Sequence, residues 1–253
     1  MRIVLPEYKN NVMKKAVKLC PDISFIESDS LLDACALLKN SNADALVAGI
    51  DITTRDMVII CKDNLEKTNK YFSSCFLMNK GDQEIIVADA GVCKNPNVEM
   101  LKDVVLETYE TAKAVLDDEP RIALLSFSSF GSGGMDPSID KIKIVINQVK
   151  LERPGIQIDG EMQLDVAICP EVAKKKAPQS TTAGSANVLI CPDLNSGNIL
   201  YKSMERFGGY IAAGPILQGF NGIVSDLSRG STVEDVALVF RTLEKIYNYK
   251  NKL

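Results

Sequence analysis

The stretch that decides how this chain is organised runs from Pro215 to Asp235 and reads PILQGFNGIVSDLSRGSTVED. Two short apolar runs separated by glycines lead into a polar turn, and the turn ends at Val233–Asp235, where a helix is expected to begin. Ser231 or Thr232 can cap that helix, and acidic residues in its first turn suit the helix dipole. The pattern predicts a strand-to-helix junction, which is where open α/β sheets place their ligands.

Three chemically useful side chains meet at this junction. Ser228 supplies a hydroxyl, Arg229 a guanidinium and Asp235 a carboxylate. The plainer alternative is a well-capped surface helix with an incidental arginine, and the local chemistry alone favours neither interpretation.

Length, charge and cysteine usage limit the class of protein. A chain of 253 residues suits one large domain or two small ones. A net charge of −4 argues against a nucleic-acid binder, and no apolar run approaches a membrane span. The start, MRIVLPEY, is typical of a strand rather than of a signal peptide. Seven scattered cysteines without a C-x-x-C pair predict reduced thiols and a cytoplasmic protein.

The chain contains no histidine. This excludes Ser-His and Cys-His nucleophilic machinery and any zinc site that needs imidazole, and we expect no metal. Proton transfer in an enzyme of this composition must use a carboxylate, lysine, tyrosine or cysteine.

Short apolar runs alternate with stretches of helical spacing. Strands are predicted at residues 3–5, 24–26, 45–49, 75–78, 85–88, 122–127, 156–158, 188–191 and 211–217. In the first predicted helix, Val12, Ala16 and Leu19 are the expected buried positions. The alternation predicts a largely parallel, doubly wound α/β architecture with a hairpin near residues 75–88.

A glycine- and serine-rich loop follows the predicted strand 122–127 and precedes a helix. In such a loop, backbone N–H groups and hydroxyls can bind an anion. The residues that could do so are Ser128, Ser129, Gly131, Ser132 and Gly133. Such a loop is equally often only a flexible turn.

Three segments together resemble the phosphate acetyltransferase (phosphotransacetylase) family of phosphate acyltransferases. They are the opening stretch, DGEMQLDVAICPEVAKKKAP at 159–178 and AGSANVLICPDLNSGNILYK at 183–202. The resemblance is dense from about residue 121 onward and thinner before it, where RIVLPE (2–7) and ADALVAGIDITT (43–54) carry it. Between those two the chain is shorter than typical members, which implies a shortened N-terminal domain.

The resemblance implies a fold and a division of the chain. The expected fold is two doubly wound α/β domains of the isocitrate-dehydrogenase-like type with a cleft between them. The first domain would comprise residues 1–68 plus 227–253, and the second 69–226. Ser228, Arg229 and Asp235 would then face the cleft.

The implied reaction is the reversible transfer of an acetyl group between acetyl phosphate and coenzyme A. By resemblance, Asp235 is the general base on the thiol, Ser228 hydrogen-bonds the thiol or the developing oxyanion, and Arg229 stabilises transition-state charge. The substrates are small molecules, coenzyme A is a substrate rather than a permanently bound cofactor, and a homodimer is expected.

The resemblance also assigns binding residues. It places phosphate at the Ser/Gly loop and at Thr53 and Thr54, and substrate or coenzyme A at Asn198, Tyr201 and Lys202, which match the segment G-N-I-x-Y-K. Tyr201 is equally compatible with a core position. The residues Lys174, Lys175 and Lys176 are interpreted as a solvated helix end rather than a site for the phosphates of coenzyme A.

One departure from the family pattern bears on activity. Where the family has Arg-Pro a few residues after the Thr-Thr pair, this chain has Ile59-Ile60, with Arg55 directly after the threonines. Whether Arg55 substitutes is left open by the spacing. Two alternatives therefore stand beside the acetyltransferase: a degenerate, non-catalytic homologue that binds coenzyme A or an acyl phosphate, and a phosphate butyryl or longer-acyl transferase.

Overall fold

The computed structural model describes residues 1–252, which form two compact units. The first unit is Met1–Phe72 together with the chain from Ile211 onward, and the second is Ser73–Tyr210. The first boundary lies close to the expected one at residues 68/69. The second differs from the expected one at 226/227, because the segment 211–226 contains two strands that complete the sheet of the first unit.

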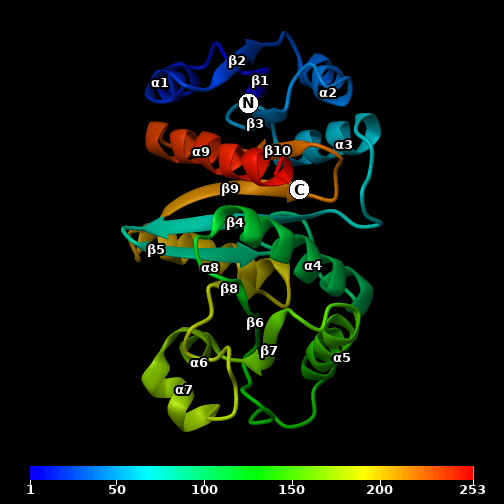
Figure 1. Ribbon diagram of the computed structural model, residues 1–253, viewed down its shortest axis with the longest axis vertical. Coiled ribbons are helices and arrows are strands. Elements are labelled where there is room, and N and C mark those ends of the chain that lie inside the picture. Colours follow the sequence, from blue (N-terminus) through cyan, green and yellow to red (C-terminus); the bar gives the residue numbers. More distant parts are fainter. Residues whose placement is uncertain (253) are drawn as a thin grey trace. The chain divides into compact units, whose positions relative to one another are not determined.

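The first unit is a five-stranded sheet with helices (Figure 1). Its strands lie in the order β2-β1-β3-β10-β9, of which the first four are parallel and β9 is antiparallel to β10. The elements are β1 (Arg2–Leu5), α1 (Asn11–Leu19), β2 (Ser24–Glu27), α2 (Leu31–Lys39), β3 (Ala45–Ala48), α3 (Thr54–Asn64), β9 (Ile211–Gln218), β10 (Ile223–Asp226) and α9 (Val233–Lys250).

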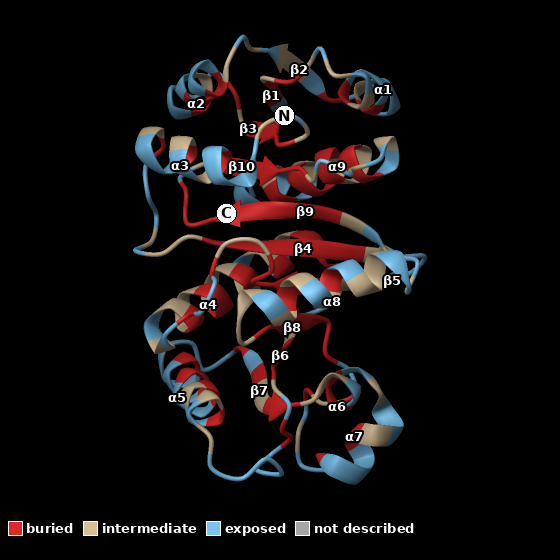
Figure 2. Cartoon of the chain, turned by 180° about the vertical axis from the view of Figure 1, so that it is seen from behind, coloured by how far each residue is buried: buried red, intermediate tan, exposed pale blue. Residues whose placement is uncertain are grey.

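The core of the first unit lies on its two central strands. Every residue of β3 and β10 is buried, which is typical of parallel strands covered on both faces (Figure 2). The expected inward face of the first helix is partly wrong: Met13 and Ala16 are buried, whereas Leu19 is 54% exposed. The helix begins at Asn11, capped by the Asn10 side chain, and it turns the face carrying Met13 and Ala16 inward.

The second unit is a mixed five-stranded sheet in the order β4-β5-β8-β6-β7. The strands β4 and β5 form the antiparallel hairpin expected near residues 75–88, and the other pairs are parallel. The elements are β4 (Ser73–Lys80), β5 (Gln83–Ala88), α4 (Val98–Val115), β6 (Arg121–Leu125), α5 (Pro137–Glu152), β7 (Gln157–Met162), α6 (Leu164–Ile168), α7 (Pro170–Lys176), β8 (Val188–Ile190) and α8 (Leu194–Arg206).

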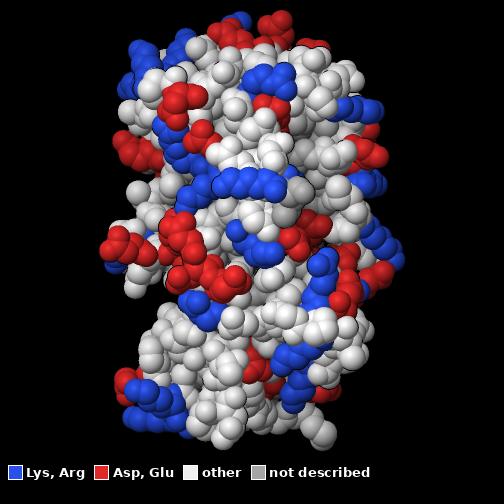
Figure 3. Space-filling view, viewed as in Figure 1, with Lys and Arg blue, Asp and Glu red and all other residues white. Residues whose placement is uncertain are grey.

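The architecture confirms the predicted α/β class. Among residues 1–252, none of the helices combines the length and the apolar character needed to cross a membrane. On the face shown in Figure 3, acidic and basic side chains are interspersed, without the broad basic surface that nucleic-acid binding requires.

Candidate functional site

The carboxyl ends of β3 and β10 bring two predicted site segments to one edge of the first sheet. The two strands are parallel neighbours, with Ala48 of β3 paired to Asp226 of β10. Each strand is followed by a short loop and a helix, α3 after β3 and α9 after β10. The threonines of one loop and the Ser-Arg pair of the other therefore lie at the same edge, where doubly wound sheets bind ligands.

Asp235 takes part in the cap of α9. The Thr232 hydroxyl accepts a hydrogen bond from the Asp235 N–H (3.1 Å), and the Asp235 carboxylate accepts one from the Thr232 N–H (2.7 Å). This is a capping box. Asp235 is only 8% exposed. The cap therefore fixes the orientation of the carboxylate that the sequence predicts as general base.

Ser228 and Arg229 lie in the turn before that helix. Ser228 is half-buried; its hydroxyl accepts a hydrogen bond from the Gly230 N–H (3.3 Å) and its carbonyl accepts one from the Ser231 N–H (2.9 Å). Arg229 is exposed and has no ion pair or hydrogen bond to the described residues. Its guanidinium is thus available to an anionic ligand.

The start of α3 holds the second group of predicted residues. Thr53 caps the helix: its hydroxyl accepts from the Asp56 N–H (3.2 Å) and donates to the Asp56 carboxylate (2.8 Å). Thr54 and Arg55 follow it and are exposed. Ile59 lies one turn beyond Arg55 on the same face of the helix and is 43% exposed.

Glu7 is a residue of this edge that the sequence did not single out. Its carboxylate accepts four backbone hydrogen bonds from the loop between β3 and α3, from Gly49 (2.7 Å), Ile50 (3.0 Å), Asp51 (2.7 Å) and Ile52 (2.7 Å). These bonds hold the backbone that leads into α3. The only local signal was an acidic residue two positions after the first strand.

The Ser/Gly loop of the second unit follows β6, as predicted, and its backbone donors are already occupied. Every N–H from residue 128 to 134 donates to an acceptor of the chain itself. The buried Glu161 carboxylate accepts from the Gly131 N–H (2.7 Å) and the Ser128 hydroxyl (2.8 Å). Burial alone would raise the pKa of Glu161, but the Gly131 and Ser128 donors, together with its own backbone N–H and the Lys143 charge, lower the pKa on balance. Phosphate binding at this loop stays a prediction, and it requires that loop N–H groups break their present hydrogen bonds and donate to phosphate instead.

The remaining predicted residues lie on α8. Tyr201 is buried and stacks on Phe76, with ring centroids 4.0 Å apart, so the core alternative describes its position. Asn198 is half-buried and Lys202 is exposed, its ammonium 4.8 Å from the centre of the Tyr201 ring.

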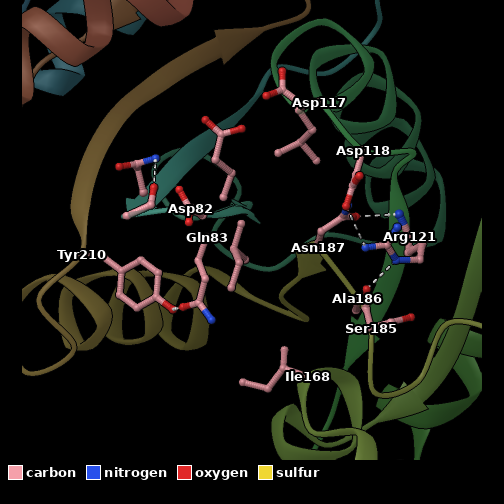
Figure 4. Close-up of a pocket in the computed structure, with 15 residues that line it drawn as sticks. Asp82, Gln83, Asp117, Asp118, Arg121, Ile168, Ser185, Ala186, Asn187 and Tyr210 are labelled. Atoms are coloured by element: carbon pink, nitrogen blue, oxygen red, sulfur yellow. Dashed lines mark hydrogen bonds and ion pairs between the residues drawn. The ribbon is translucent and has the colours of Figure 1, made fainter.

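A pocket of about 600 Å³ lies in the second unit at a different place (Figure 4). It lies where β5, β6 and β8 begin, whereas the Ser/Gly loop follows the end of β6. Gln83 and Tyr210 are hydrogen-bonded there (2.9 Å), and Arg121 donates to the Ser185 carbonyl (2.6 Å). None of the predicted site residues lines this pocket, so its size does not make it the candidate site.

Comparison with known proteins adds a family to this geometry. The model of the phosphate acetyl/butaryl transferase family matches residues 6–241. The phosphate acetyltransferase of Clostridium acetobutylicum is 39% identical over 93% of this chain and 71% of its own length. The phosphate acetyltransferase of Bacillus subtilis is 42% identical over 79% of this chain and 62% of its own. A phosphotransacetylase structure from Streptococcus pyogenes superposes with a TM-score of 0.87 at 30% identity, covering 98% of this chain and 94% of that one.

Proposed function

This chain belongs to the phosphate acetyl/butaryl transferase family, and we propose that it catalyses the reversible transfer of an acetyl group between acetyl phosphate and coenzyme A, with Asp235 as the general base. The observation that carries the proposal is the junction at the end of β10, where Ser228, Arg229 and a cap-oriented Asp235 follow one buried strand. The resemblance gives the roles, and the geometry is compatible with each.

The chemistry suits the groups present. A thiol has an ordinary pKa of about 8.5 and must lose its proton before it attacks the carbonyl. Asp235 takes that proton, the sulfur–carbon bond forms, and the bond from carbon to the phosphate oxygen breaks as phosphate leaves. Ser228 donates to the developing oxyanion, and Arg229 offers a bidentate guanidinium to the phosphate.

Substrate binding is assigned to both units. In the first unit, the exposed start of α3 with Thr54 and Arg55 is proposed to bind the acyl phosphate. In the second unit, the Ser/Gly loop is proposed to bind phosphate, and Asn198 and Lys202 of α8 to bind coenzyme A. The route needs no resident metal or cofactor. Activity that survives dialysis against a chelator would support this part.

The cellular location and the assembly are further proposals. We propose a cytoplasmic protein, because all seven cysteines are free thiols and six are buried. We propose a homodimer, for which the exposed side chains of Ile199 on α8 and Phe207 at its end offer a surface.

The decisive experiment is an assay of acetyl-CoA formation from acetyl phosphate by the purified chain. Butyryl phosphate in the same assay tests the longer-acyl alternative, and isothermal titration with coenzyme A tests the non-catalytic one. Turnover of acetyl phosphate faster than butyryl phosphate is the expected result. Coenzyme A binding without turnover of either would leave only the non-catalytic homologue.

A further inference from the structure

The last residue of β10 is a carboxylate in an unusual environment. Asp226 is fully buried, and within the described chain both of its carboxylate oxygens lack a hydrogen-bond partner. Burying a charged group without partners costs free energy, and native proteins rarely leave one in this state. The position therefore calls for a reason other than stability.

The surrounding elements leave room for the carboxylate but give it no donor. Gly49, in the loop after β3, has φ +119°, and any Cβ there would collide with the Asp226 carboxylate. The four N–H groups of that loop all donate to Glu7 instead. Burial raises the pKa of Asp226 to about 6; the Thr54 hydroxyl opposes the rise, and the Glu7 carboxylate adds to it.

Two more observations describe the neighbourhood. The Thr54 hydroxyl lies close enough to favour the ionised form, although no full hydrogen bond joins it to Asp226. The Cys61 thiol of α3 is also near: its pKa is raised by Cys35, by burial and in small part by Asp226. The titratable groups that face Asp226 are therefore Glu7, after β1, and Cys61, on α3.

The location connects the two predicted substrate segments of this edge. Asp226 immediately precedes the turn that carries Ser228 and Arg229, and it faces Thr54 in the first turn of α3. The positive end of the α3 dipole and the Thr54 hydroxyl both attract a negative charge at this point. A carboxylate here therefore acts on both segments at once.

We propose that Asp226 is a positioning residue for the acetyl transfer, which as a carboxylate holds the first turn of α3 and the Ser228–Arg229 turn in the arrangement that the reaction uses. The proposal rests on the function proposed above. Protonation removes the charge that attracts α3, so activity should fall as the pH decreases through the pKa of Asp226.

The test is Asp226→Asn, which keeps the size of the side chain and removes the charge. We expect kcat at pH 7.5 to fall by about 10-fold or more, as for other losses of catalytic geometry, while KM for coenzyme A changes less than threefold. The wild-type kcat should decrease as the pH is lowered, with a midpoint near pH 6, and kcat of the variant should not show this decrease.

Thermal unfolding separates this role from a structural one. A raised pKa means that protonated Asp226 favours folding, and that this contribution is lost as the pH rises through about 6. Asp226→Asn should therefore raise Tm at pH 7.5, by about 5 °C, and less at pH 5. The matched control is Ser225→Ala in the same buried strand, β10, which removes the hydrogen bond from the Ser225 hydroxyl to the Pro215 carbonyl. It should lower Tm and leave the pH dependence of kcat unchanged.

A second variant keeps the inference testable if Asp226→Asn does not fold. Thr54→Val removes the group that favours the ionised form and leaves the Thr53 cap intact, so the acid midpoint should move to higher pH. Suppose the wild type is active, but kcat of Asp226→Asn still falls at low pH, or the acid midpoint of Thr54→Val equals that of the wild type. Either result overturns the inference and leaves the proposed function standing. A wild type without acetyl transfer at any pH overturns both.

Discussion

Asp235 caps α9, and we propose that the same carboxylate is the general base of the reaction. The Thr232 N–H donates to the Asp235 carboxylate and holds it in place. Asp235→Asn should lower kcat by about 10²–10³ with little change in coenzyme A binding, since no histidine can replace the base. Steady-state kinetics and titration of coenzyme A measure the two effects.

The control for this prediction is Thr232→Ala, which breaks the same capping box. It should cost about 1 kcal/mol of unfolding free energy and leave kcat within a few-fold. If the two variants lose the same stability and keep the same kcat, Asp235 is only a cap.

Site residues could be predicted from the sequence only where the interacting residues are close together along the chain. The cap, the hydroxyl and the guanidinium of the α9 junction lie within eight residues of one another, so local rules identified them. Glu7 and Glu161 were missed because their partners are about 42 and 30 residues away. Proximity of this kind depends on the order of strands in the sheet, which no local pattern contains.

At the scale of elements, α3 carries the departure from the family pattern. Arg55 and Ile59 share an exposed face, so an arginine at 59 adds positive charge there without disturbing the core. An acyl phosphate carries about two negative charges, and a nearby guanidinium should bind it more tightly. Ile59→Arg should lower KM for acetyl phosphate, or produce turnover if the wild type shows none.

The matched control is Ile144→Arg on α5, an isoleucine that is similarly exposed (45% against 43%). It adds the same charge elsewhere and should leave KM unchanged. An equal effect of both variants would indicate net charge rather than position. Wild-type activity with no effect of Arg55→Ala would show that the missing arginine is not needed.

The loop between β6 and α5 gives a second prediction at this scale. Phosphate can use the Gly131 N–H only if Glu161 releases it. Glu161→Gln removes the competing charge and should tighten phosphate binding several-fold, measured by isothermal titration. Glu171→Gln, on the exposed surface of α7, is the control. Unchanged affinity in Glu161→Gln would place phosphate elsewhere.

The sequence predicted where helices begin better than it predicted which face of a helix is buried. The helix starts at Ser30, Thr53, Asn97 and Thr232 all carry side-chain caps, and Thr232 is one of the two caps that the sequence indicates for the last helix. The inward face of α1 was misjudged at Leu19, because a nine-residue helix leaves the choice of face to the neighbours it packs against, α9 among them.

For the whole molecule, the strand alternation was enough to predict the α/β class but not the place where the chain returns to the first unit. The returning segment begins at Ile211, before β9, rather than at residue 227. β9 and the start of β10 are apolar like the strands of the second unit, and only the pairing of β10 with β3 assigns them to the first. The amino-acid composition of these strands does not indicate that β10 pairs with β3.

The last prediction concerns assembly. Ile199 and Phe207, eight positions apart along α8 and its end, are 66% and 92% exposed, and large apolar side chains this accessible often mark an interface. We expect a mass near twice 27.6 kDa by light scattering, and dissociation when both are changed to serine. Leu151→Ser on α5, at an 84% exposed leucine, is the control and should leave the dimer intact. A wild-type mass of 27.6 kDa at every concentration, or dissociation by Leu151→Ser alone, would contradict a dimer formed through α8.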